Sequence, residues 1–115
     1  MASRFSRARI RAAAPLFAAL GDPTRLGLVV LLAASGPQSI AALSDHVDVS
    51  RQAVTKHLHV LADAGLVHGA RHGREHIWEL KPKRLADARE HLARIDAQWD
   101  AALERLRTFV EDDPH

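Results

Sequence analysis

Residues 50–64 restrict the possible folds of this chain most, because they have the pattern of one short amphipathic helix. Ser50 is a favoured N-cap residue and Gly65 is a frequent residue just beyond a helix end, so both ends are marked. At about 100° per residue, one face is apolar and carries Val54, His57, Leu58, Leu61 and Ala64. The other face has one acid, Asp63, near its C-terminal end. Its remaining polar side chains are Gln52, Thr55, Lys56 and His59, and Arg51 lies at its edge in the first turn. All five can reach a phosphate or a base edge.

A second, shorter helix is predicted just before this one. Ser39 can cap a helix whose inward positions follow the i, i+3, i+7 pattern: Ile40, Leu43 and Val47. A turn at Asp48-Val49 then leads into the helix that begins after Ser50. Two short helices joined by a tight turn, the second with a polar outward face, predict a helix-turn-helix over residues 39–65.

Two further helices are predicted ahead of this motif. The first is expected from about Arg9 to Leu20, with three residues inward: Leu16, Phe17 and Leu20. The second restarts at Asp22-Pro23, a favoured N-cap followed by a proline, and ends at Gly36-Pro37. Residues 26–32 are apolar nearly all round, so this helix is expected to be the buried one. His57, on the apolar face of the later helix, is expected to be a core residue bonded to a backbone carbonyl.

From residue 66 the periodicity changes from that of a helix to that of strands. Residues 67–71 and 75–80 predict two strands around His72-Gly73-Arg74, with Trp78 turned inward. The hairpin follows the helix directly and carries two arginines at its tip, Arg71 and Arg74. Residues 66–81 are therefore interpreted as the wing of a winged helix-turn-helix. The predicted fold class is mainly α with a small β-hairpin.

Pro82 introduces one long helix, predicted over residues 83–110, before an acidic tail at residues 111–115. Its apolar residues alternate at spacings of three and four, which is a heptad seam: Leu85, Ala88, Leu92, Ile95, Trp99, Ala102, Leu106 and Phe109. A single domain of this size seldom needs so long and narrow a seam for its own core. We therefore expect a homodimer that forms through the terminal helices, with interface residues Leu16, Leu85, Leu92, Ile95, Trp99, Leu106 and Phe109.

The composition narrows the class of protein. With 115 residues and 47% hydrophobic content, the chain is expected to form one globular domain over residues 1–115. It has no cysteine, which excludes disulfides, thiolate metal sites and thiol nucleophiles. No apolar run approaches the roughly 20 residues of a membrane span, and the expected location is the cytoplasm. Arginines without acids mark residues 1–12 as a basic N-terminal arm.

The motifs favour neither an enzyme nor a metal protein. The sequence has no G-x-S-x-G elbow, no phosphate-binding glycine loop and no H-E-x-x-H motif, so no catalytic residue is assigned. Asp87 and His91 are spaced i, i+4 on the final helix and, with Glu90, resemble part of a zinc site. Surface helices carry such pairs by chance, so no metal ligand and no cofactor are predicted. Arg25 is expected to make a structural ion pair or to touch a phosphate.

The distribution of charge suggests a polyanion partner, and the polar helix face with its turn and wing favours DNA. Residues 51–84 carry seven basic residues against three acidic ones, whereas residues 85–115 carry four basic against eight acidic. Gln and Arg can read adenine and guanine edges, so we expect DNA contacts from Ser50, Arg51, Gln52, Thr55, Lys56, His59, Arg71 and Arg74. The alternative is a dimeric protein-interaction module with the same fold that has lost DNA binding. Carboxylates would then be expected to accumulate over residues 51–59, where there are none.

Four strings resemble the ArsR/SmtB type of winged-helix repressor: FAALGDPTRLGLVVLL (17–32), VSRQAVTKHLHVLADAGLV (49–67), GREHIWEL (73–80) and AQWDAALERLRTFVE (97–111). The resemblance covers nearly the whole chain beyond residue 15, and the second string is the most specific. It implies a homodimer that binds inverted-repeat operators, is released by a signal and represses its own or a neighbouring operon.

The resemblance also bears on metal sensing. Arsenic- and lead-sensing members have cysteines at positions that match Ser39 and Ala41 here, and the last string resembles the branch of the family without metal-binding cysteines. The paired Asp and His ligands of zinc-sensing members find no match on the final helix. The sequence does not identify the inducing signal.

Overall fold

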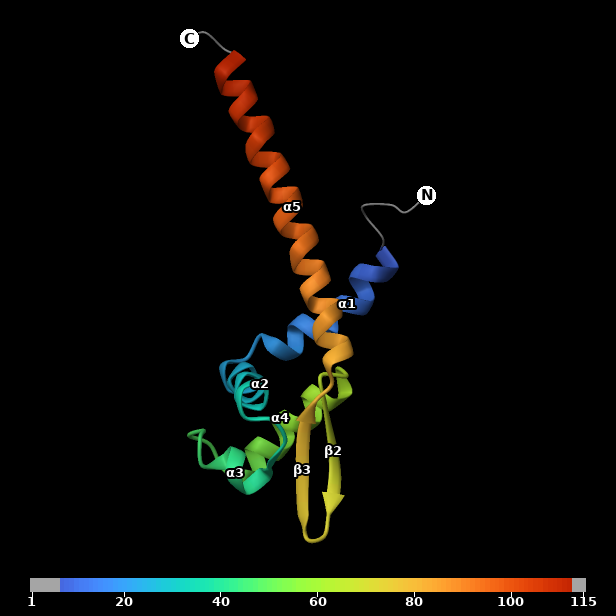
Figure 1. The fold of residues 1–115 in the computed structure, drawn as a ribbon, viewed down its shortest axis with the longest axis vertical. Coiled ribbons are helices and arrows are strands. Elements are labelled where there is room, and N and C mark those ends of the chain that lie inside the picture. The colour runs from blue at the N-terminus through green and yellow to red at the C-terminus, as the bar shows by residue number, and fades with distance from the viewer. Residues whose placement is uncertain (1–6, 113–115) are drawn as a thin grey trace.

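The computed structural model describes residues 7–112, in which helices pack beside a small antiparallel sheet (Figure 1). The elements in chain order are α1 (Arg7–Leu20), α2 (Pro23–Ser35), β1 (Gln38–Ser39), α3 (Ile40–Ser44), α4 (Arg51–Asp63), β2 (Val67–His72), β3 (Glu75–Leu80) and α5 (Pro82–Asp112). The long α5 projects from one end of the body, and the hairpin of β2 and β3 projects from the other (Figure 1). The predicted fold class, a mainly α winged helix-turn-helix with a hairpin, is confirmed.

The predicted helix-turn-helix is formed by α3 and α4. Both helices begin at the predicted caps: Ser39 Oγ accepts a hydrogen bond from the Ala42 N–H at 3.1 Å, and Ser50 Oγ accepts one from the Ala53 N–H at 3.1 Å. Each cap satisfies one of the N–H groups that the start of a helix leaves unpaired. The chain leaves α4 through Gly65, whose φ of 79° is a left-handed conformation that favours glycine.

The sheet has three strands in the order β1-β3-β2, one more than the sequence predicted. β1 is only two residues long, and it pairs Gln38 with Trp78 and Ser39 with Ile77. A two-residue strand has no alternation to detect, and Ser39 was identified only as a helix cap. β1 ties the start of the helix-turn-helix to the wing, since β3 also pairs with β2 along its whole length.

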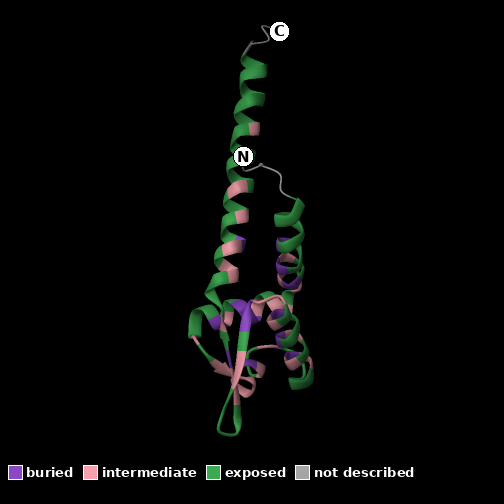
Figure 2. Ribbon diagram, turned by 90° about the vertical axis from the view of Figure 1, so that its right-hand side faces the viewer, coloured by how far each residue is buried: buried purple, intermediate pink, exposed green. Residues whose placement is uncertain are grey.

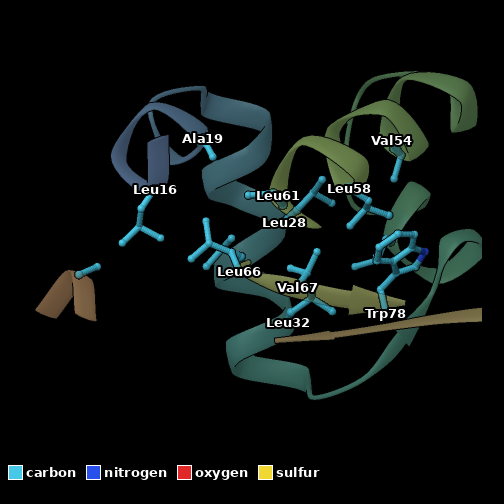
Figure 3. Packing of buried hydrophobic residues seen from close by; sticks show 13 residues of the cluster. Leu16, Ala19, Leu28, Leu32, Val54, Leu58, Leu61, Leu66, Val67 and Trp78 are labelled. Carbon is cyan, nitrogen blue, oxygen red and sulfur yellow. The ribbon is translucent and has the colours of Figure 1, made fainter. Parts of the chain in front are cut away.

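One apolar core joins the helices to the sheet. Figure 3 shows its side chains meeting between α2, α4 and the strands, among them Leu28, Leu58, Leu61, Val67 and Trp78. Burial of such side chains contributes about 1.5–3 kcal/mol each. α2, expected to be the buried helix, is buried only in part, because Leu26 and Val30 are 48% and 59% exposed. Only one face of α2 packs against the body, with Leu28, Val29 and Leu32.

α5 begins against α1 and then leaves the body. The Arg84 side chain fixes its start, because it donates hydrogen bonds to the Ala64 carbonyl at 3.4 Å, to the Ala12 carbonyl at 3.1 Å and to Asp87 Oδ2 at 3.2 Å. Ala88 is buried there. Beyond it the seam is exposed along the helix (Figure 2): Leu92 54%, Ile95 58%, Trp99 63%, Leu106 59% and Phe109 70%.

Two residues expected at a dimer interface lie elsewhere. Leu16 is fully buried in the chain's own core, and Leu85 is half-buried against the same core. Leu16 faces inward because α1 packs on α2, α4 and α5 at once. A fully buried side chain is not available to a partner, so the expected contribution of Leu16 is wrong.

The chain ends also differ from the sequence-based expectation. α1 begins at Arg7, so residues 7–12 of the expected arm are helical, and α5 continues to Asp112. Residues 1–6 of the expected arm and 113–115 of the expected tail lie outside the described residues. Within the described part, no single helix is long and apolar enough to cross a bilayer, and α1 with α2 reaches that length only across a 92° bend.

Arg25 and His57 link α1, α2 and α4. Arg25 Nε donates to the Ala19 carbonyl at 2.6 Å, and its Nη1 lies 3.3 Å from His57 Nδ1. Asp22 Oδ2 accepts from the Arg25 N–H at 3.0 Å and lies 3.9 Å from His57 Nδ1. His57 is therefore half-buried in a polar network, and the expectation that it bonds to a backbone carbonyl is wrong.

We expect the contribution of Asp22 to stability to depend on pH. The hydrogen bond from the Arg25 N–H lowers the pKa of the Asp22 carboxyl. A lowered folded-state pKa means that this stabilisation is present above the unfolded pKa of about 4 and is lost as the pH falls through the folded value. Asp22→Ala should lower the Tm at neutral pH, and the difference from wild type should shrink in acid.

Thermal melts followed by circular dichroism from neutral pH downwards measure this difference. Asp22→Asn is the matched control, because its amide oxygen still accepts from the Arg25 N–H without titrating. A Tm difference between Asp22→Ala and wild type that stays constant with pH would contradict the assignment.

Two glycines should respond to alanine in opposite ways. A Cβ at Gly69 would lie 2.7 Å from His76 Nε2 and 3.0 Å from the Trp78 ring, whereas a Cβ at Gly27 in α2 meets nothing within 4 Å. Gly69→Ala should lower the free energy of unfolding, because the buried indole must shift. Gly27→Ala should raise stability by about 0.5–1 kcal/mol through its higher helix propensity. Denaturant unfolding measures the free energy of unfolding of both variants. Equal changes in the two would contradict the close contact between Trp78 and Gly69.

Candidate nucleic-acid interface

The outward face of α4 presents cationic and amide side chains. Gln52, Lys56 and His59 are exposed on this face, opposite the buried Val54, Leu58 and Leu61, and Arg51 is exposed at its edge in the first turn. Ser50 and Thr55, also expected to contact DNA, have hydrogen bonds of their own: Ser50 Oγ caps the helix, and Thr55 Oγ1 donates to the Arg51 carbonyl at 2.9 Å. Thr55 is only half-exposed. α4 thus exposes four polar side chains on this face and at its edge.

The wing carries its two arginines at the far end of the hairpin. Gly73, with φ of 65°, makes the tight turn after β2, and Arg71 and Arg74 are exposed on either side of it. Because side chains alternate along a strand, Arg71 lies on the same face of β2 as Gly69 and Val67. That face packs against the core through Val67, so Arg71 is on the side of the hairpin that faces α4.

The other face of the wing carries the acids. The register pairs His68 with Glu79 and His72 with Glu75, and strand alternation places all four on the face away from the core. The two faces of the hairpin therefore differ in charge. A polyanion approaching α4 meets Arg71, while Glu75 and Glu79 are turned to the other side.

An aromatic contact joins α4 to the wing. The imidazole of His59 on α4 meets the Trp78 indole edge-on, with ring centroids 5.6 Å apart and planes at 87°. On its own strand Trp78 is stacked with His76, at 4.8 Å and 29°. Trp78 is 2% exposed, and its Nε1 has no hydrogen-bond partner within the described residues. A ring contact thus adds to the shared apolar core where α4 meets the wing.

A cavity of about 240 Å³ lies between α1 and α5, and it contains the residues considered for a zinc site: Asp87, Glu90 and His91. Both carboxylates there are paired, Asp87 with Arg84 at 3.2 Å and Glu90 with Arg94 at 2.7 Å. The His91 ring lies edge-on to Phe17 at 6.4 Å. Among residues 7–112, no three His, Asp or Glu side chains gather in a way that would hold a metal ion.

Some residues of this surface were not identified from the sequence. Arg25 holds His57 behind α4, and its position in the string DPTR gave only a choice between an ion pair and a phosphate contact. Gly69 and His76 were not singled out, although a glycine inside a strand often marks a close approach by a neighbouring group. That signal points correctly to Trp78, which pairs with Gly69 across the hairpin.

The chain is similar to known transcriptional regulators. A family model described as a helix-turn-helix domain matches residues 20–70. The chain is 31% identical over 97 residues to the arsenical resistance operon repressor of Escherichia coli, covering 84% of this chain and 80% of that protein. It is 36% identical over 95 residues to an HTH-type transcriptional regulator of Mycobacterium tuberculosis, covering 83% and 85% of the two chains.

Solved structures give the same result. An ArsR-like transcriptional regulator from Rhodococcus sp. RHA1 matches with a TM-score of 0.71 and 35% identity, over 86% of this chain and 92% of that one. A possible transcriptional regulator for arsenical resistance matches with a TM-score of 0.63 and 39% identity, over 84% and 94%. These proteins are named as regulators or repressors and not as enzymes. The chain belongs to the ArsR family of winged helix-turn-helix transcriptional regulators.

Proposed function

We propose that this protein is a homodimeric repressor that binds an inverted-repeat operator near its own or a neighbouring operon, in the cytoplasm. The observation that carries the proposal is the outward face of α4, which is exposed and has no acidic residue over residues 51–59. The opposite face of α4 is buried in the core, and the wing carries basic residues at its tip. In this proposal α4 enters the major groove, as the second helix of a helix-turn-helix does.

The α4 side chains divide by chemistry. Gln52 is in the first turn, where recognition helices meet base edges, and its amide can bond adenine bidentately. Arg51 beside it can bond guanine through two nitrogens. Lys56, one turn further along, is a flexible point charge and suits a phosphate, as does the Ser50 hydroxyl. Thr55 Oγ1 already donates its one hydrogen to the Arg51 carbonyl. Base contacts specify the sequence, while phosphate contacts fix the position of the protein.

The wing supplies the second contact with the same duplex. Arg71 and Arg74 are exposed at the far end of the hairpin, which projects from the body (Figure 1). Arginine inserts into narrow minor grooves, where the negative potential is strongest, or pairs with the phosphates that line them. The face of the hairpin that carries Arg71 turns away from Glu75 and Glu79, which supports this orientation.

The homodimer is proposed to form through the exposed seam of α5. Leu92, Ile95, Trp99, Leu106 and Phe109 make an apolar stripe along a helix that leaves the body (Figure 2). Soluble monomers rarely expose so much contiguous apolar surface. A second copy of the same seam fits it through heptad packing. The interface proposed here starts beyond Leu85 and omits the buried Leu16.

Three α4 and α5 variants should separate base reading from phosphate binding. Gln52→Ala should weaken binding to the specific duplex by about 1–3 kcal/mol and leave binding to random DNA nearly unchanged. Lys56→Ala should weaken both alike and reduce the salt dependence by about one unit of slope. Arg107→Ala, which removes a charge from the far part of α5, should change neither.

Mobility shifts with the duplex directly upstream of its own gene, at several salt concentrations, make these measurements. If Gln52→Ala and Lys56→Ala both retain wild-type affinity, α4 is not the recognition helix. If the wild-type chain binds no DNA at all, the alternative of a winged-helix protein-interaction module is favoured.

Substitutions in the apolar seam of α5 should change the oligomeric state. Trp99→Glu places a charge in the centre of the proposed interface and should convert the dimer to a folded monomer. Ala97→Glu adds the same charge on the opposite side of the helix and should leave the dimer intact. Sedimentation velocity at micromolar concentration compares them. A wild-type chain that sediments as a monomer would contradict the proposed interface.

A further inference from the structure

His59 differs from the other exposed polar residues of α4 in what its ring touches. It lies on the same face as Gln52 and Lys56, yet its imidazole forms a T-shaped contact with the Trp78 indole, with ring centroids 5.6 Å apart and planes at 87°. Such an edge-to-face arrangement is the favourable geometry for two aromatic rings. No comparable contact with the wing is present for Gln52 or Lys56 within the described residues.

Trp78 is held tightly on the wing side of this contact. The indole lies over Gly69, where a Cβ would come within 3.0 Å of two of its ring carbons, and it is stacked with His76 at 4.8 Å. It is 2% exposed and belongs to the common core. The position of the indole is therefore set by β2 and β3, so a contact with it transmits the orientation of the wing to α4.

We propose that His59 is a positioning residue, which sets the angle between α4 and the wing through its ring contact with Trp78 and does not itself read a base or a phosphate. The inference rests on the proposed DNA-binding function and deepens it. It replaces the direct DNA contact that the sequence pattern predicted for His59.

The angle matters because α4 and the wing tip have to reach one duplex together. When two linked contacts engage the same partner, the second gains from an effective concentration that depends on geometry, and this gain is lost if the two do not fit simultaneously. A loosened joint leaves α4 able to bind but lowers the benefit of Arg71 and Arg74. The effect of His59 should therefore depend on the wing arginines.

Substitutions at His59 separate a ring contact from a polar contact. His59→Phe keeps an aromatic ring against Trp78 and removes both nitrogens, whereas His59→Asn keeps hydrogen-bonding groups and removes the ring. We expect His59→Phe to bind the upstream duplex within about twofold of wild type. His59→Asn and His59→Ala should each lose about three- to tenfold, the range of one aromatic edge contact.

A double-mutant cycle with the wing completes the test. In an Arg71→Ala, Arg74→Ala background, His59→Ala should cause little further loss, because the wing no longer contributes. Lys56→Ala is the matched control and should cause its full loss in both backgrounds. Thermal melts establish that each variant is folded before its affinity is measured by mobility shift.

Three results would overturn the positioning role while the proposed function stands: affinity retained by His59→Asn and lost by His59→Phe, losses that add fully with those of the wing arginines, or no loss with His59→Ala. A wild-type chain that binds neither the upstream duplex nor random DNA would instead overturn the proposed function, and the positioning role with it.

Discussion

The burial of one face of α4 determines what this protein presents to its surroundings. Val54, Leu58 and Leu61 are fully buried, so α4 cannot rotate about its axis without exposing three large side chains, at about 1.5–3 kcal/mol each. That single constraint holds Gln52 and Lys56 outward. The same core includes Val67 and Trp78 from the wing, so helix and hairpin are positioned by one set of contacts.

Much of the fold was predictable because local chemistry and tertiary structure agree. Ser39, Ser50 and Asp22 are good caps by residue type alone, and each caps the helix that the sequence predicted. The errors have physical causes. An apolar stretch such as residues 26–32 has the same periodicity whether its outer face is covered or exposed, so the exposure of Leu26 and Val30 was not predictable. The two-residue β1 exists only because β3 is there to pair with it.

The sequence predicted which side chains of α4 share the exposed face, but it did not predict the role of each residue. Helical periodicity placed the exposed polar side chains of α4 on one side correctly. Which partners His57 and His59 have depends on residues far away in the chain, Arg25 and Trp78, and no local pattern specifies such pairs. Two histidines two residues apart thus differ in role, one linking α4 to α1 and α2 and the other to the wing.

The length of α5 gives small angles a large effect. Its 31 residues extend for about 46 Å, but its contacts with α1 involve only the first few turns, where Arg84 and Ala88 lie. Only the N-terminal end of α5 is therefore fixed to the body. A tilt of about 10° there displaces the C-terminal end of α5 by about 8 Å. In a homodimer joined along α5, the same tilt would turn each copy of α4 about the base of α5, where Arg84 bonds the Ala64 carbonyl, and would change how the two copies face half-sites roughly 34 Å apart. The spacing that such a dimer can read is thus governed by the packing around Arg84, far from any residue that faces DNA.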